Sequence, residues 1–208
     1  MDGSTYEIEE DQLGQICARI FKNPKSKIQE INFDFQTEKS YTRISNFNPN
    51  CKIKATQLTW KDSKELGEEF LRILKYFDSK YLEMLKLEPE ISREFLDQVC
   101  KTEQWKCAKK LEATGNFDTR IDWFMHFEQI TVQKMYFLSV EKAVEIVKNF
   151  QNRNLPVGSF FKICTEFPIM VDTVLTHFSE RFLDSKFEIS AFPTKRIFFF
   201  HFTTKTIH

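Results

Sequence analysis

The chain has 208 residues, enough for one domain with a sizeable hydrophobic core. Its 30 lysine and arginine residues balance 30 aspartate and glutamate residues, so net charge gives no argument for nucleic acid or a membrane surface as the main partner. Glycine is scarce, with 5 residues, which disfavours the glycine-rich loops that cradle phosphates. Phenylalanine is abundant, with 23 residues, and most of these rings are expected to fill the core.

Targeting and redox features point to the cell interior. Residues 1–11 are acidic and lack the apolar stretch of a signal peptide, and uncharged runs such as 197–204 are too short to span a bilayer. The 5 cysteines are scattered and odd in number, as expected for reduced thiols rather than a disulfide framework. We therefore expect a cytoplasmic or nuclear protein that is neither secreted nor bound to a membrane.

The first predicted elements are a helix, a strand and a loop. Apolar residues fall on one face of a helix over 13–21, and Asn23-Pro24 ends it. A strand is expected over 28–35, where apolar and polar residues alternate. Residues 36–50 are polar and end in Asn-Pro-Asn, which predicts a loop.

The next stretch alternates strand and helix. A strand near Trp60 precedes Asp62-x-x-Glu65, a capping box that is expected to begin a helix. The apolar stripe of this helix consists of Leu66, Phe70, Ile73, Leu74 and Phe77. A strand holding Leu85 and Leu87 follows, and Ser92 is expected to begin another helix.

The second half continues the alternation. A strand around Leu111 is expected to end at Gly115, and a brief helix or turn follows with Ile121 and Phe124. Ser139 caps a helix, a strand lies near Ile163, and a further helix follows Pro168. Residues 187–207 are predicted as two strands joined by a turn at 193–195.

One short pattern recurs along these strands: an apolar residue, two of any kind, an apolar residue, one of any kind and an apolar residue. Its copies start at residues 28, 55, 82 and 108, separated by 27, 27 and 26, and two less regular copies start at 127 and 160. A period in this range is typical of stacked repeats, each a strand plus a helix. We predict an α/β fold, a leucine-rich-repeat-like stack with a mostly parallel sheet, helices on one face and a C-terminal β-hairpin.

The residues between the apolar positions are expected on the sheet face that the helices leave open, because side chains alternate along a strand. Most of them are polar or charged, which suits plain solvated surface as well as a binding surface. As candidate partner-binding residues we select Asn32, Gln57, Thr59, Lys61, Met84, Lys86, Glu88, Lys110, Glu112, Gln129, Thr131 and Lys162.

Catalytic and metal-binding signatures do not occur in the sequence. The 4 histidines are far apart, and no zinc, calcium, nucleotide or nucleophile-elbow motif is found. Asp122 and His126 are spaced to face each other on one helical turn, but no nucleophile lies nearby. Short basic clusters at 22–27 and 106–110 leave RNA binding as a weaker alternative. We expect no enzyme activity, no metal and no cofactor.

Four segments resemble signatures of one known family. Residues 73–87, with Tyr-Phe-Asp-Ser-Lys, and 103–111, with Glu-Gln-Trp-Lys, are similar to the first two signatures of the FTH domain, an F-box-associated domain expanded in nematodes. Residues 124–132 and 139–147 resemble the third and fourth signatures, and 21–28 resembles the lead-in to the first strand. The resemblance implies a single FTH-like domain over 7–208, after a flexible N-terminus at 1–6.

The resemblance also implies a function. In that family the domain usually follows an F-box, which binds the Skp adaptor of a cullin-based ubiquitin ligase, and the FTH domain is taken to select the target protein. Nothing before residue 20 resembles an F-box, so the chain is either a fragment or an FTH-only protein. We expect a protein-binding module for substrate recognition, which meets Skp and cullin only if an F-box is supplied elsewhere. The alternative is a stand-alone adaptor or regulatory scaffold unconnected to ubiquitination. A cryptic hydrolase and an RNA-binding protein are the less favoured alternatives.

Overall fold

The computed structural model describes residues 27–35, 52–62, 66–117, 121–165, 173–174, 176–178, 187–192 and 197–202. The strands are β1 (Ile28–Phe35), β2 (Ala55–Asp62), β3 (Met84–Leu87), β4 (Lys110–Phe117), β5 (Gln129–Met135), β6 (Phe160–Thr165), β7 (Phe187–Phe192) and β8 (Ile197–Phe202). The helices are α2 (Glu68–Leu74), α3 (Arg93–Val99), α4 (Glu103–Cys107), α5 (Val140–Asn152) and the 3-10 helix η2 (Ile121–Phe124).

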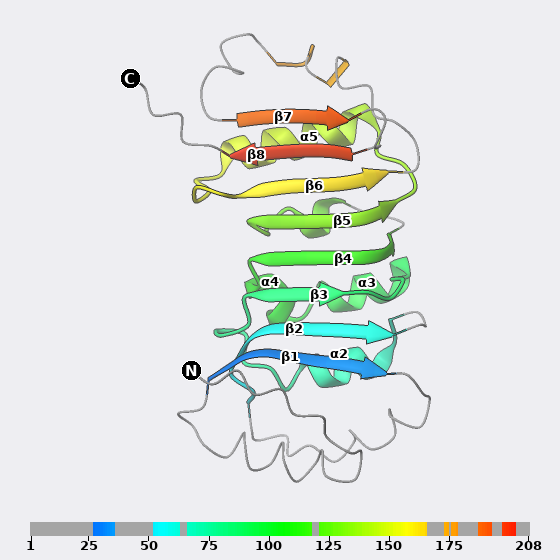
Figure 1. The fold of residues 1–208 in the computed structure, drawn as a ribbon, viewed down its shortest axis with the longest axis vertical. Helices are drawn as coiled ribbons and strands as arrows, with labels where there is room; N and C mark the ends of the chain where they lie inside the picture. Colours follow the sequence, from blue (N-terminus) through cyan, green and yellow to red (C-terminus); the bar gives the residue numbers. More distant parts are fainter. Residues whose placement is uncertain are drawn as a thin grey trace.

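The strands form one sheet in the order β1-β2-β3-β4-β5-β6-β8-β7. β1 to β6 follow chain order and every neighbouring pair among them is parallel. In Figure 1 the labelled helices lie behind the sheet, so the face toward the viewer carries none of them. The predicted α/β fold, with a mostly parallel sheet and helices on one face, is confirmed. β8 pairs antiparallel with β6 and with β7. The turn predicted between β7 and β8 lies outside the described residues, so the hairpin stays a prediction.

The repeated pattern sets the register of the first five strands. The middle apolar position of each copy pairs with that of the next, through Ile31, Leu58, Leu85, Leu111 and Ile130. The sixth copy is different, because Ile130 pairs with Phe161 and not with Ile163. The pattern of this copy is therefore offset by two residues from the strand register. A two-residue shift keeps each side chain on its face, since the period of a strand is two.

One core fills the space between the sheet and the helices. Trp60 of β2 lies between Phe33 of β1 and Phe70 of α2, with ring centroids 5.4 Å apart in both pairs. Further along the sheet, Trp105 of α4 packs edge to face on Phe127, at 5.1 Å between centroids. Offset and edge-to-face ring pairs of this kind are favourable beyond the area that they bury. Eight of the phenylalanines that the structure describes are buried in this core, in line with the expectation from composition.

The start of α2 differs from the prediction. The helix begins at Glu68 with Gly67 as its N-cap, and not at the capping box of Asp62, because Asp62 is the last residue of β2. Phe77 was expected on the stripe of this helix but lies beyond its end. It pairs instead with Ile53 in an isolated parallel bridge, and both side chains are buried. This bridge ties the end of α2 to the segment that leads into β2.

The other helices largely follow their start signals. Ser92 and Ser139 are the N-caps of α3 and α5, as predicted, and the Ser139 hydroxyl accepts a hydrogen bond from the backbone of Lys142. The helix α4 was not predicted. β4 does not end at Gly115 but continues to Phe117. Its pairing with β5 shifts register between Ala113 and Asn116.

Some predicted features fall outside the described residues. The helix over 13–21, the loop over 36–50 and most of the helix after Pro168 belong to this group, as does the boundary of the domain at residue 7. Among the helices that are described, none is both long enough and apolar enough to cross a bilayer.

Candidate functional site

The open face of the sheet brings the predicted binding residues together. Strand register places them in rows that run across the strands. The first row contains Glu30, Gln57, Met84, Lys110, Gln129 and Phe160. The second row contains Asn32, Thr59, Lys86, Glu112, Thr131 and Lys162. Asp34 and Lys61 pair in a third row, and Glu88 lies beside Lys61. We call this surface, defined by these residues, the open face.

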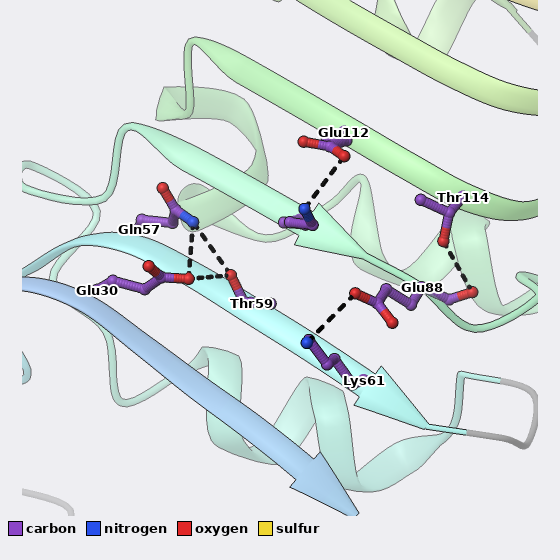
Figure 2. Close-up of polar contacts among 8 residues, drawn as sticks. Glu30, Gln57, Thr59, Lys61, Glu88, Glu112 and Thr114 are labelled. Carbon is purple, nitrogen blue, oxygen red and sulfur yellow. Dashed lines mark hydrogen bonds and ion pairs between the residues drawn. The ribbon is translucent and has the colours of Figure 1, made fainter. Parts of the chain in front are cut away.

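Hydrogen bonds cross from β1 to β2 on the open face. The Thr59 hydroxyl donates to Glu30 Oε1 at 2.8 Å, and Gln57 Nε2 donates to the same oxygen at 2.9 Å (Figure 2). These partners cover Thr59, whose exposed fraction is only 2 %. Thr59 therefore orders the Glu30 carboxylate and presents little surface of its own, unlike the other predicted residues.

Two ion pairs occupy the middle of the open face. Lys86 Nζ on β3 lies 3.2 Å from Glu112 Oε1 on β4, and Lys61 Nζ lies 3.9 Å from Glu88 Oε1 (Figure 2). The Thr114 hydroxyl donates to the carbonyl oxygen of Glu88 at 3.4 Å. Exposed pairs like these contribute only about 0.2–1 kcal/mol to stability. Their main effect is to neutralise the middle of the surface.

The two ends of the open face differ in charge. Near β1, Glu30 and Asp34 are exposed carboxylates. Over β4 to β6, Lys110 and Lys162 form no ion pair with any residue in the described part of the chain. We call these two groups the acidic end and the basic end. A partner that covers the open face meets opposite charges at its two ends.

Phe160 is an open-face residue that sequence reasoning missed. It was assigned to an apolar pattern position and hence to the core, but its row partner is Gln129 and it is only partly buried. The adjacent Phe161 is the buried residue, at 1 % exposure. Because both are phenylalanines, the sequence pattern alone does not distinguish which ring faces the core.

Asp122 and His126 do not form the pair that their spacing suggested. Asp122 Oδ1 lies 3.4 Å from Lys142 Nζ, whereas His126 Nε2 lies 2.7 Å from the Trp105 carbonyl oxygen. Since a carbonyl only accepts, this nitrogen carries the proton and donates it. Burial lowers the pKa of His126, although the hydrogen bond to Trp105 opposes the shift. His126 is thus held as a neutral, packed ring.

The Cys100 thiol is poorly placed to act as a nucleophile. Burial raises the pKa of the Cys100 thiol to about 12, so it carries almost no thiolate at neutral pH. Within the described ranges, no group of three or more histidine, cysteine, aspartate or glutamate side chains is placed to hold a metal ion.

Comparison with known families assigns most of the chain to one family. The family model of the FTH domain matches residues 38–182. This chain belongs to the FTH domain family. The matched range contains β2 to β6 with their helices, and every predicted binding residue of the FTH domain except Asn32. No curated protein and no solved structure matches the chain.

Proposed function

We propose that the open face of this FTH domain captures a target protein. The observation that carries the proposal is a sheet face that carries none of the described helices and whose side chains stand in cross-strand rows with opposite charge at the two ends. A stable interface buries about 800 Å² on each partner, and six parallel strands offer a surface of that order. Flanking polar residues and a few partly buried apolar groups such as Met84 give the mixed chemistry of a non-obligate interface.

The charge distribution says what the target must present. A complementary target has acidic groups opposite Lys110 and Lys162 and basic groups opposite Glu30 and Asp34. Complementary potentials of this kind raise association rates and reject wrong partners more than they raise affinity. The ion pairs between the two ends require no charged partner on the target, because Lys86 Nζ and Glu112 Oε1 already pair at 3.2 Å.

The cellular role that we propose follows from the family. In F-box proteins the FTH domain is taken to select the target of a cullin-based ubiquitin ligase, and membership of the family supports the same role for this chain when an F-box accompanies it. Its place of action would be the cytoplasm or the nucleus. A stand-alone adaptor unconnected to ubiquitination is the second candidate. Affinity purification from native extract separates the two, because recovery of Skp and cullin with the chain is expected only for the first.

Charge reversal tests the open face directly. With a target from the purification in hand, Lys110→Glu and Lys162→Glu should each weaken binding about tenfold, since each places a carboxylate where the target is acidic. Lys148→Glu on the exposed side of α5 changes the net charge equally and should leave the affinity unchanged. If both open-face variants bind as tightly as the Lys148→Glu control, the target does not lie on the open face.

A further inference from the structure

A second feature lies at the end of the sheet where the parallel strands begin. Here a hollow of about 900 Å³ is formed by the segment before β2, the end of α2 with the turn after it, the end of α3 and the start of α4. It is lined by Lys52, Leu71, Lys75, Phe77, Asp78, Ser79, Lys80, Gln98, Lys101, Thr102, Glu103 and Gln104. We call it the basic hollow. No residue of the open face contributes to it.

The floor of the basic hollow is rigid. Leu71 and Phe77 are buried core residues, and Gln104 Nε2 donates to the Phe77 carbonyl oxygen at 2.8 Å. The backbone of Asp78 donates to the Ile53 carbonyl oxygen at 2.8 Å, which fixes the turn to the segment before β2. A ligand would therefore meet a preformed surface, which lowers the entropic cost of binding.

The charges of the lining do not balance. Four lysines, Lys52, Lys75, Lys80 and Lys101, line the hollow, and none forms an ion pair with a described residue. The one partner of the Lys52 ammonium group among the described residues is the Lys75 carbonyl oxygen, at 2.6 Å. Both acids of the lining are already engaged: Asp78 accepts from the Lys80 backbone at 3.1 Å, and Glu103 pairs with Lys106 at 3.0 Å. The described lining thus carries four lysines against two acids, over an apolar floor.

We propose that the basic hollow binds an acidic segment of a polypeptide. Its volume lies in the range of about 300–1,000 Å³ typical of ligand sites. Carboxylate side chains would reach the four lysines, whose compact ammonium groups donate hydrogen bonds to them in many directions. The peptide backbone would meet the polar side chains of Ser79, Gln98 and Thr102 at the rim.

The two acids favour a peptide over a small phosphate ligand. A compact polyanion that reached all four lysines would also approach Asp78 and Glu103, which repel it. A peptide separates its charges along a chain and brings N–H donors that those carboxylates accept. Among the described residues the lining contains no arginine, the residue whose planar fork matches phosphate oxygens in pairs.

This inference rests on the proposed function only in that the ligand is a segment of protein. It concerns a separate surface and is tested without the target of the open face. The probe is a fluorescein-labelled hexaglutamate peptide, with hexaglutamine as the uncharged control, and binding to the full chain is followed by fluorescence anisotropy at low and at physiological salt.

The expected result is saturable binding of hexaglutamate but not of hexaglutamine. Lys75→Glu and Lys101→Glu should each weaken it by about tenfold or more, while the exposed controls Lys109→Glu and Lys148→Glu change it less than about twofold. Thermal melts of all four variants establish that they are folded. Lys75→Gln, which removes a charge without reversing it, should give an intermediate loss.

Four outcomes would overturn the inference, three with the peptide and the hollow variants and one with the open-face variants. The first is no binding of hexaglutamate, and the second is an equal loss in the hollow and control variants, which indicates diffuse attraction. The third is displacement of the peptide by equimolar inorganic pyrophosphate, which points to a small polyanion. Open-face variants Lys110→Glu and Lys162→Glu should leave hexaglutamate binding unchanged. Loss in these variants would place the peptide on the open face and refute the inference while leaving the proposed function standing.

Discussion

Arg153, directly after α5, joins the end of that helix to the turn between η2 and β5. Its Nη2 donates to the carbonyl oxygen of His126 at 2.6 Å, and its Nη1 donates to that of Phe127 at 3.0 Å and to that of Met125. The guanidinium also lies 5.8 Å from the ring centroid of Phe150. One side chain thus supplies the donors for three consecutive carbonyl groups.

Replacement by methionine keeps the aliphatic stem and removes these donors. Hydrogen bonds to a charged group contribute about 1.5–3 kcal/mol each where water is excluded. Arg153 is only partly buried, so water can replace some of the lost donors in the variant. We therefore expect Arg153→Met to lower the free energy of unfolding by about 2–4 kcal/mol, well below the simple sum. Arg153→Lys should recover about half, because one ammonium group cannot serve three carbonyls with the geometry of a fork.

Urea unfolding, monitored by circular dichroism, measures the effect. Midpoints are compared only between variants whose free energy of unfolding depends on urea with the same slope. Arg93→Met at the exposed start of α3 is the matched control, and it should change the free energy of unfolding by less than about 0.5 kcal/mol. Two results would refute the reasoning: an Arg153→Met variant as stable as the control, or an Arg153→Lys variant as stable as the unmodified chain.

Further predictions concern the ion pair, the buried histidine and the thiols. A double-mutant cycle on Lys86 and Glu112 should give a coupling of about 0.2–1 kcal/mol that shrinks with added salt, and a larger, salt-independent value would contradict the surface pair. Burial lowers the pKa of His126 below its ordinary 6.5, so the unfolded chain binds more protons and the free energy of unfolding should fall as pH drops below about 6.5. His126→Gln should remove that part of the pH dependence, and identical pH profiles would disprove the assignment. In the folded chain at pH 8, the exposed Cys107 should react with iodoacetamide well before Cys100, because burial raises the pKa of Cys100 to about 12. Mass spectrometry of the labelled peptides measures the order of reaction, and earlier labelling of Cys100 would contradict the prediction.

The spacing of the repeat was sufficient to predict the sheet. Leu58 and Leu85 are 27 residues apart and pair in register, with the single helix α2 described between their strands. The sixth copy of the pattern is offset by two residues from the register of β5 and β6, and the offset has a physical reason. Phe160 and Phe161 are equally apolar, and the connections on either side of β5 differ in length, so neither composition nor spacing specifies the register there.

The site was predictable only in part. Alternation along a strand correctly placed Lys86 and Glu112 on the same face, one residue from buried neighbours. Burial of Thr59 was not predictable, since it depends on Glu30 reaching across from the neighbouring strand. The basic hollow was also missed, because its lysines come from separate connections between strands and helices, and only the packing of α2, α3 and α4 brings these together.

Because side chains alternate along a strand, residues that pack the core and residues that form the open face alternate within the eight residues of β2. In β2, Leu58 and Trp60 are fully enclosed by the core, whereas Gln57 and Lys61 belong to rows on the other side. A substitution at one of the latter positions alters a single point of a surface pattern and leaves the packing beneath it intact. Each added strand contributes one such point to every row. Chains built on this plan can therefore diversify what they display, position by position, while they continue to fold in the same way.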